Sequence, residues 1–252
     1  MVLIHTRMQT LNITLPTCWQ ELTPAQLRYV YYLISSGFTS NEVKTYVIFR
    51  WANIEVIAPE GDGFAVKFEG RPVRITAQQI AELLPHLAWL DCFPAYPVRL
   101  PELCGHKAAE ADLRDISLET YLTCDNNYIG YLYTQDDQRL EDMGAWLYGA
   151  ATDPKFNLSS EERLSIFYWF GAAKELLARR FKNFFKTAPL DRETTNLQLK
   201  LQEGVDAQIR ALTKGDITKE RQVLDMDVWR ALTELDAQVV DAEEIKRQLH
   251  QS

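Results

Sequence analysis

The chain has 252 residues, of which 46% are hydrophobic and 25% are charged. This composition is enough to fill a sizeable hydrophobic core, and it excludes a disordered or low-complexity protein. The formal net charge of -8 at pH 7 creates a field that repels phosphate groups, so it disfavours nucleic-acid binding as the main role.

The sequence shows no sign of export or membrane insertion. Its first residues lack a long apolar region and a small-residue cleavage site, so we expect no secretory signal and assign no function to residues 1–7, before Met8. The most apolar run, residues 164–173, is far shorter than the roughly 20 residues that span a bilayer. The four cysteines lie far apart without a CxxC pair, which is typical of reduced thiols in a cytoplasm.

Three segments near the N-terminus carry the same helix-start chemistry. Thr23, Thr39 and Thr76 are each followed three positions later by Gln or Glu, which is the capping-box pattern, and apolar residues flank each box as a hydrophobic staple. We therefore expect one helix that ends near Ser36, a second that ends near Trp51, and a third that begins at Thr76.

The segment between the second and third helices predicts a small antiparallel β meander, at about residues 54–75. Its three runs, 54–58, 64–69 and 72–75, are separated by glycine-containing turns. Residues 11–15 alternate apolar and polar side chains, so we expect them to add a strand to the same sheet.

The middle of the chain begins with a proline-broken stretch, residues 91–115, which predicts a loop or crossover. Helix signals return at 117 and run to about 149, with a polar break near Asp136. The region 158–185 then predicts one long helix whose apolar stripe is continuous at spacings of three and four. Such a helix normally lies at the centre of a bundle. The stripe consists of Ile166, Phe170, Ala173, Leu177, Phe181 and Phe184.

After Pro189 the composition becomes polar and charged, which indicates a domain boundary. Two thin apolar stripes follow, over residues 197–212 and 224–249, and they predict a helical hairpin or a coiled-coil-like arm. The sequence therefore predicts a mainly α fold. A helical bundle with the meander occupies residues 1–188, and the C-terminal helical hairpin or arm occupies residues 189–252.

A search for chemistry finds no phosphate-binding loop, no GxSxG elbow and no HExxH pair. Cys104 and His106 form the one close Cys and His pair, and a metal site would need further ligands such as Cys92 and His86. Without paired spacing we expect no metal, no cofactor and no catalytic residue. An enzyme of unrecognised class stays open, because paired carboxylates come together only in the fold.

One stretch, residues 174–186, mixes basic and aromatic side chains as some nucleic-acid sites do. Phe181 and Phe184 lie on the predicted core stripe, however, so a basic helix terminus explains the pattern better. The same surface also suits an acidic protein partner.

Three stretches, residues 15–27, 158–185 and 214–237, together resemble tail assembly chaperones from tailed phages and prophages of Bacteroides-type bacteria. The resemblance implies a non-enzymatic protein of the bacterial host cytoplasm that keeps the long tape-measure protein soluble during virion assembly. It supplies no catalytic residues. A virion structural component, such as a connector or tail-completion protein, is the alternative that it leaves open.

The C-terminal arm is the candidate partner-binding element, because a thin apolar stripe suits the groove of a helical partner. We expect its contacts to a tape-measure or tail protein to come from Val228, Trp229, Leu232 and Leu235. The competing interpretation is that these side chains pack onto residues 1–188 or onto a second copy of the chain.

Overall fold

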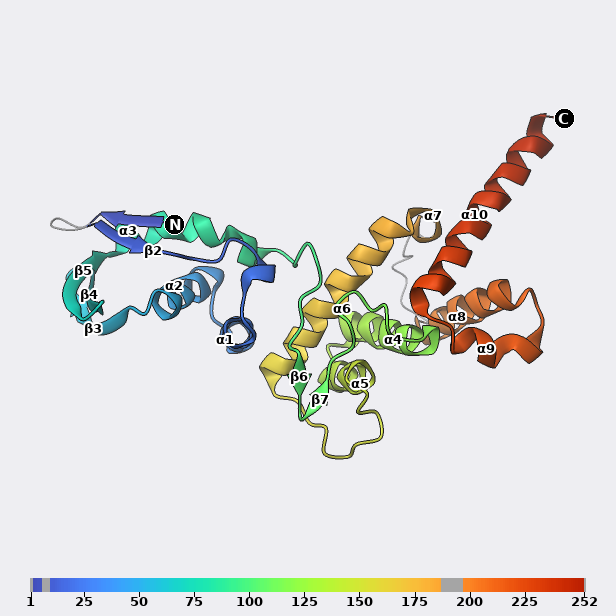
Figure 1. The fold of residues 1–252 in the computed structure, drawn as a ribbon, viewed down its shortest axis with the longest axis horizontal. Helices are drawn as coiled ribbons and strands as arrows, with labels where there is room; N and C mark the ends of the chain where they lie inside the picture. Colours follow the sequence, from blue (N-terminus) through green and yellow to red (C-terminus); the bar gives the residue numbers. More distant parts are fainter. Residues whose placement is uncertain (1, 6–9, 187–196, 252) are drawn as a thin grey trace. The chain divides into compact units, whose positions relative to one another are not determined.

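The computed structural model of the chain describes residues 2–5, 10–186 and 197–251. The chain divides into two compact units, made of residues 1–94 with 159–168 and of residues 95–158 with 169–252. Helix α6 (Ser160–Arg180) contributes its beginning to the first unit and the rest to the second (Figure 1). Pro189, where the sequence predicted a domain boundary, lies outside the described residues, as does Met8.

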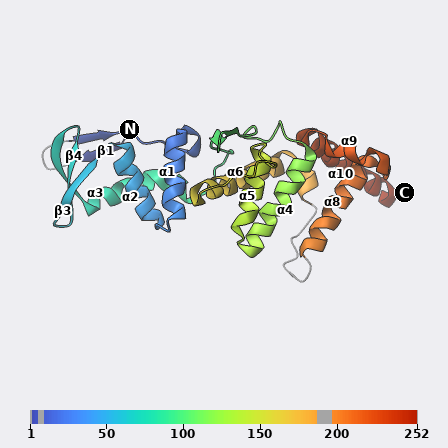
Figure 2. The same cartoon turned by 90° about the horizontal axis from the view of Figure 1, so that it is seen from below.

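The first unit combines short helices with two small antiparallel sheets, both visible in Figure 2. Its strands are β1 (Val2–His5), β2 (Thr10–Ile13), β3 (Glu55–Glu60), β4 (Gly63–Phe68) and β5 (Arg71–Thr76). Its helices are α1 (Pro24–Ser35), α2 (Ser40–Trp51), α3 (Ala77–Leu83) and the 3-10 helices η1 (Trp19–Glu21) and η2 (Leu84–Asp91).

The three predicted capping boxes are all present. Thr23, Thr39 and Thr76 each accept a hydrogen bond through the side chain from the backbone N–H three residues on. The Gln or Glu side chain at that position accepts a hydrogen bond from the threonine backbone N–H. Each box satisfies N–H groups that a helix otherwise leaves without a partner, so the helices begin at these residues.

The predicted meander is confirmed as the sheet β3-β4-β5. The further strand predicted at residues 11–15 is formed as β2, but its place differs from the prediction. It pairs with β1 in a separate two-stranded sheet, with Val2 opposite Ile13 and His5 opposite Thr10. The neighbouring strand β1, rather than the meander, therefore supplies the hydrogen-bonding edge.

An aromatic cluster forms the centre of the first unit. The Trp19 ring stacks on Tyr31 with the ring centroids 5.8 Å apart, and it meets the Trp89 ring edge-on at 5.5 Å. The Trp19 indole N–H donates to the backbone carbonyls of Trp89 and Cys92, each at 3.1 Å. Tyr168 of α6 packs on the same cluster, which ties the start of α6 to the first unit.

The second unit is built mainly from helices. It contains α4 (Leu118–Thr134), α5 (Asp137–Leu147), α7 (Lys182–Phe185), α8 (Leu197–Thr213), η3 (Ile217–Lys219), α9 (Glu220–Leu224) and α10 (Val228–Gln251), besides its part of α6. The stretch predicted as a loop, residues 91–115, includes a small hairpin whose strands have two residues each, β6 (Glu102–Leu103) and β7 (His106–Lys107). Helix α8 contacts α9 and α10, which forms the predicted C-terminal hairpin.

The long helix predicted over residues 158–185 is interrupted. Phe181 has φ -109° and ψ 53°, which ends α6 and separates it from α7. Asp236 of α10 accepts hydrogen bonds from the backbone N–H groups of Asn183 at 2.8 Å and Phe184 at 2.9 Å. This contact from a distant part of the chain caps α7, because it satisfies backbone N–H groups that the break in the helix leaves without an intrahelical acceptor.

Asp236 also gives the second unit a pH dependence. Burial opposes its ionisation, but the N–H bonds from Phe184 and Asn183 outweigh burial, so the pKa of Asp236 is lowered. A lowered folded-state pKa stabilises the fold above the unfolded value of about 3.9, and this contribution is lost as the pH falls through the folded value.

We expect Asp236→Ala to lower the free energy of unfolding at pH 7 by about 1 kcal/mol, because two backbone donors lose their acceptor. The difference from the unsubstituted protein should shrink when urea unfolding is repeated below pH 3. Asp241→Ala, at an exposed position of the same helix, is the matched control. An equal loss at both pH values would show that the carboxylate charge contributes nothing.

The boundary predicted between residues 188 and 189 lies outside the described residues, and the helices on both sides of it belong to the second unit. The start of α10 is bound to the start of α4, because Leu118 N–H donates to the Met226 carbonyl at 2.8 Å and Val228 N–H donates to the Ile116 carbonyl at 3.1 Å. The C-terminal helices therefore share a core with residues 95–158. The polar composition after Pro189 reflects exposed helix faces within one unit.

Candidate partner-binding surface

The first half of α10 is anchored in the second unit through Trp229. Its indole N–H donates to the Asp112 carbonyl at 2.8 Å, and the Arg114 guanidinium lies 4.4 Å from the centre of its ring. The Phe181 ring meets Trp229 edge-on, with the centroids 5.5 Å apart. The contacts with Asp112 and Arg114 hold the helix against residues that precede it by more than a hundred positions.

The four side chains predicted to contact a partner belong to this anchored half. Val228 and Leu232 are 0% exposed and Leu235 is 4% exposed, while Trp229 is half-buried. Three of the four are therefore inaccessible to a partner in this conformation. Their burial matches the competing interpretation, in which the stripe packs onto the rest of the chain.

The second half of α10 lacks this cover. Every residue from Val240 to Leu249 is exposed, and Figure 1 shows these turns extending beyond the other helices of the second unit. The apolar stripe nevertheless continues, since Val239, Ala242 and Ile245 follow Leu235 at spacings of four, three and three. Ile245 is 57% exposed, so the stripe changes from a core contact into an accessible surface.

We call the exposed half of α10, residues 239–249, the terminal surface. Its charges are separated along the helix: Asp241, Glu243 and Glu244 come first, and Lys246 and Arg247 follow. Arg247 lies 3.4 Å from Glu243 in an exposed i,i+4 pair, which contributes little to stability. The surface therefore presents an apolar stripe beside a negative segment and then a positive one.

Sequence reasoning found the apolar stripe of α10 but did not separate its buried half from its exposed half. Periodicity identifies one face of a helix and carries no information on how far along that face the core extends. Only the structure shows that the packing of α10 against α4, α7 and α8 leaves Val240 and Ile245 exposed.

The chain shows no match to protein-family models, to curated proteins or to solved structures. The terminal surface is therefore judged from its own geometry. No helix in the described part of the chain is both long and apolar enough to cross a membrane.

The candidate metal ligands fall in different places. His86 lies in η2 and Cys92 directly follows it in the first unit, whereas Cys104 and His106 lie on the small hairpin of the second. His106 Nε2 lies 2.9 Å from Asp153, and this hydrogen bond lowers the pKa of the Asp153 carboxyl group. Within residues 2–5, 10–186 and 197–251, no three His, Cys, Asp or Glu side chains gather as a metal site would need.

The cysteines have individual environments. All four are free thiols, and Cys104 donates its S–H to the Asn157 carbonyl at 3.3 Å. Cys124 is fully buried, and this burial raises the pKa of its thiol far above the ordinary value. Cys124 therefore stays protonated at neutral pH and is a poor nucleophile.

Proposed function

We propose that the protein is a non-enzymatic adaptor or assembly chaperone that binds a helix of an elongated protein partner through the terminal surface. The observation that carries this proposal is the apolar stripe of α10, which continues past the core into turns that are exposed on all sides. A second helix that packs along the stripe would bury Ile245 between two apolar seams.

The chemistry of the terminal surface describes the partner. A matching helix carries apolar residues at spacings of three and four, basic residues opposite Asp241 to Glu244, and acidic residues opposite Lys246 and Arg247. A tape-measure protein is a long helical chain with such stripes, and the resemblance to tail assembly chaperones points to this class. On this proposal the protein covers the stripe until the tail tube assembles.

The proposal predicts a specific loss of binding. Burying an isoleucine side chain contributes roughly 1.5–3 kcal/mol, and an aspartate in its place adds the cost of a buried charge. We therefore expect Ile245→Asp to raise the Kd for the partner at least about tenfold. The measurement is isothermal titration calorimetry with a tape-measure protein as the proposed partner.

A matched control lies in the same unit. Ile217 is 82% exposed in η3, so Ile217→Asp makes the same chemical change away from the terminal surface. It should leave the Kd within about twofold, which corresponds to less than about 0.5 kcal/mol. Equal weakening by both substitutions would refute the assignment. A dimer of twice 29.1 kDa that Ile245→Asp dissociates would also refute the assignment, since a second copy of the chain would then cover the stripe.

A further inference from the structure

The first unit contains an apolar groove that the proposed function does not use. It encloses about 660 Å³ between α2 and the meander. Tyr46 and Phe49 of α2 line one side, and Val56 of β3 and Phe64 of β4 line the other. The rings of Phe49 and Phe64 meet edge-on with their centroids 6.0 Å apart, so the groove has an aromatic lining formed by two elements.

The groove runs beside an open sheet edge. In the sheet β3-β4-β5, strand β3 pairs only with β4, and all six of its residues are exposed. Val56 is 43% exposed and Ile57 is 59% exposed. An edge strand with unpaired backbone groups and apolar side chains is a template for an added strand. Among the described residues, no strand covers this edge.

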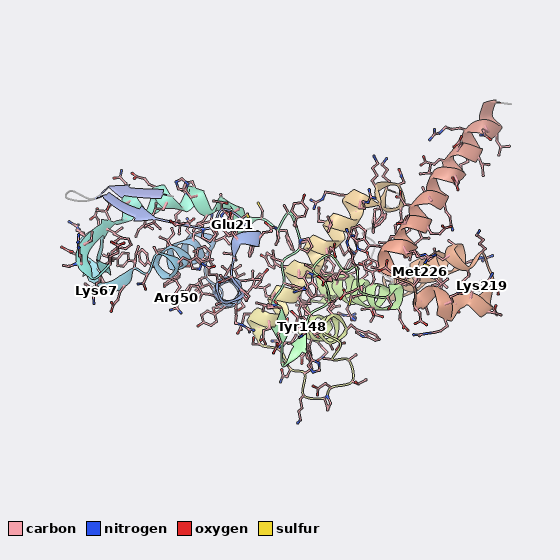
Figure 3. The ribbon with its side chains drawn as sticks, viewed as in Figure 1. Glu21, Arg50, Lys67, Tyr148, Lys219 and Met226 are labelled. Atoms are coloured by element: carbon pink, nitrogen blue, oxygen red, sulfur yellow. The ribbon has the colours of Figure 1, made fainter. Side chains whose placement is uncertain are left out.

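The charges around the groove select the chemistry of an occupant. Arg50, near the C-terminal end of α2 (Figure 3), lies 5.6 Å from the centre of the Tyr29 ring and forms no ion pair with any described residue. Glu42 also lines the groove, but its carboxylate accepts hydrogen bonds from the Thr39 N–H at 2.8 Å and the Thr39 hydroxyl at 2.7 Å. Among the side chains that line the groove, the uncommitted charge is therefore positive and favours a carboxylate.

We propose that this groove and β3 bind an extended, acidic segment of a protein partner. The segment adds to β3 as a new strand, places an apolar side chain against Tyr46 and Phe49, and pairs a carboxylate with Arg50. Backbone hydrogen bonds to β3 supply the binding mode, and the groove with Arg50 supplies the selectivity. This site is separate from the terminal surface and does not depend on the proposed function.

The test uses the full chain and a short synthetic peptide as the probe. The peptide alternates threonine and valine, which favours an extended conformation, and carries one phenylalanine beside one aspartate. A second peptide has lysine in place of the aspartate, and a third has alternate backbone nitrogens methylated to block strand pairing. Fluorescence anisotropy gives the Kd of each labelled peptide.

We expect the aspartate peptide to bind at least about tenfold more tightly than the lysine peptide, and the methylated peptide to bind far more weakly than its parent. Arg50→Gln should abolish the difference between aspartate and lysine. Arg71→Gln, an exposed change on the opposite edge strand β5, should preserve that difference. Circular dichroism is the control, and it should show that both variants keep their helical content.

Several results would overturn the proposal. One is an aspartate peptide that fails to bind at millimolar concentration, or that binds no better than the lysine peptide. Methylation without effect would show that no strand is added to β3. Tighter binding by a helical peptide of the same composition would assign the groove to a different class of occupant.

Discussion

Replacing Trp169 with alanine is expected to lower the free energy of unfolding of the second unit by roughly 3–5 kcal/mol. Trp169 of α6 is 0% exposed, and its indole N–H donates to the Ala111 carbonyl at 2.8 Å. Its ring meets Tyr148 edge-on at 5.9 Å, and the Tyr148 hydroxyl in turn donates to the Leu100 carbonyl at 2.7 Å. Alanine would leave a large cavity and would remove the donor of the Ala111 carbonyl.

The control for Trp169 is another tryptophan of the same unit. Trp146 of α5 is 38% exposed, so Trp146→Ala should cost no more than about 1 kcal/mol. Urea unfolding followed by circular dichroism compares the two variants. Tyr148, which contacts Trp169, is labelled in Figure 3. Equal losses would mean that α6 does not form the centre of the second unit.

Gly63→Ala is expected to destabilise the meander of the first unit by about 2–3 kcal/mol, since overpacking forces the backbone to shift. A β carbon at Gly63 would lie 2.1 Å from the Ile75 carbonyl oxygen and 2.7 Å from the Thr76 α carbon. Both are backbone atoms of β5, which pairs with β4. No change of side-chain rotamer relieves these contacts.

The meander variant is compared with an alanine substitution that has room. A β carbon at Gly204, in α8, meets nothing within 4 Å, so Gly204→Ala should raise stability by up to about 1 kcal/mol. Hydrogen exchange measured by mass spectrometry should show lost protection in β3 to β5 for Gly63→Ala alone. Unchanged protection there would contradict the close packing of β4 on β5.

Sequence reasoning succeeded where a feature depends on near neighbours. The capping boxes at Thr23, Thr39 and Thr76 each involve residues three positions apart, so the pattern and the hydrogen bonds coincide. The meander was likewise predicted from its turns and its β-forming runs. The mainly α fold follows from these local signals together with the apolar stripes.

Sequence reasoning failed where distant residues decide the structure. The break at Phe181 is held by Asp236, which lies more than fifty positions away. The burial of Leu232 and Leu235 depends on how α10 packs against α4 and α7. For the same reason the sequence did not show that the stripe is buried at Leu232 and Leu235 and exposed at Ile245.

Hydrogen exchange of the full chain, with and without a tape-measure protein as the proposed helical partner, tests the proposed binding most directly. Binding through the terminal surface predicts that the amides of residues 240–249 exchange fast in the free chain and become protected in the complex. It also predicts little change in the amides of residues 228–235, which the core already shields. A complex in which the amides of residues 240–249 exchange as fast as in the free chain would contradict binding through the terminal surface.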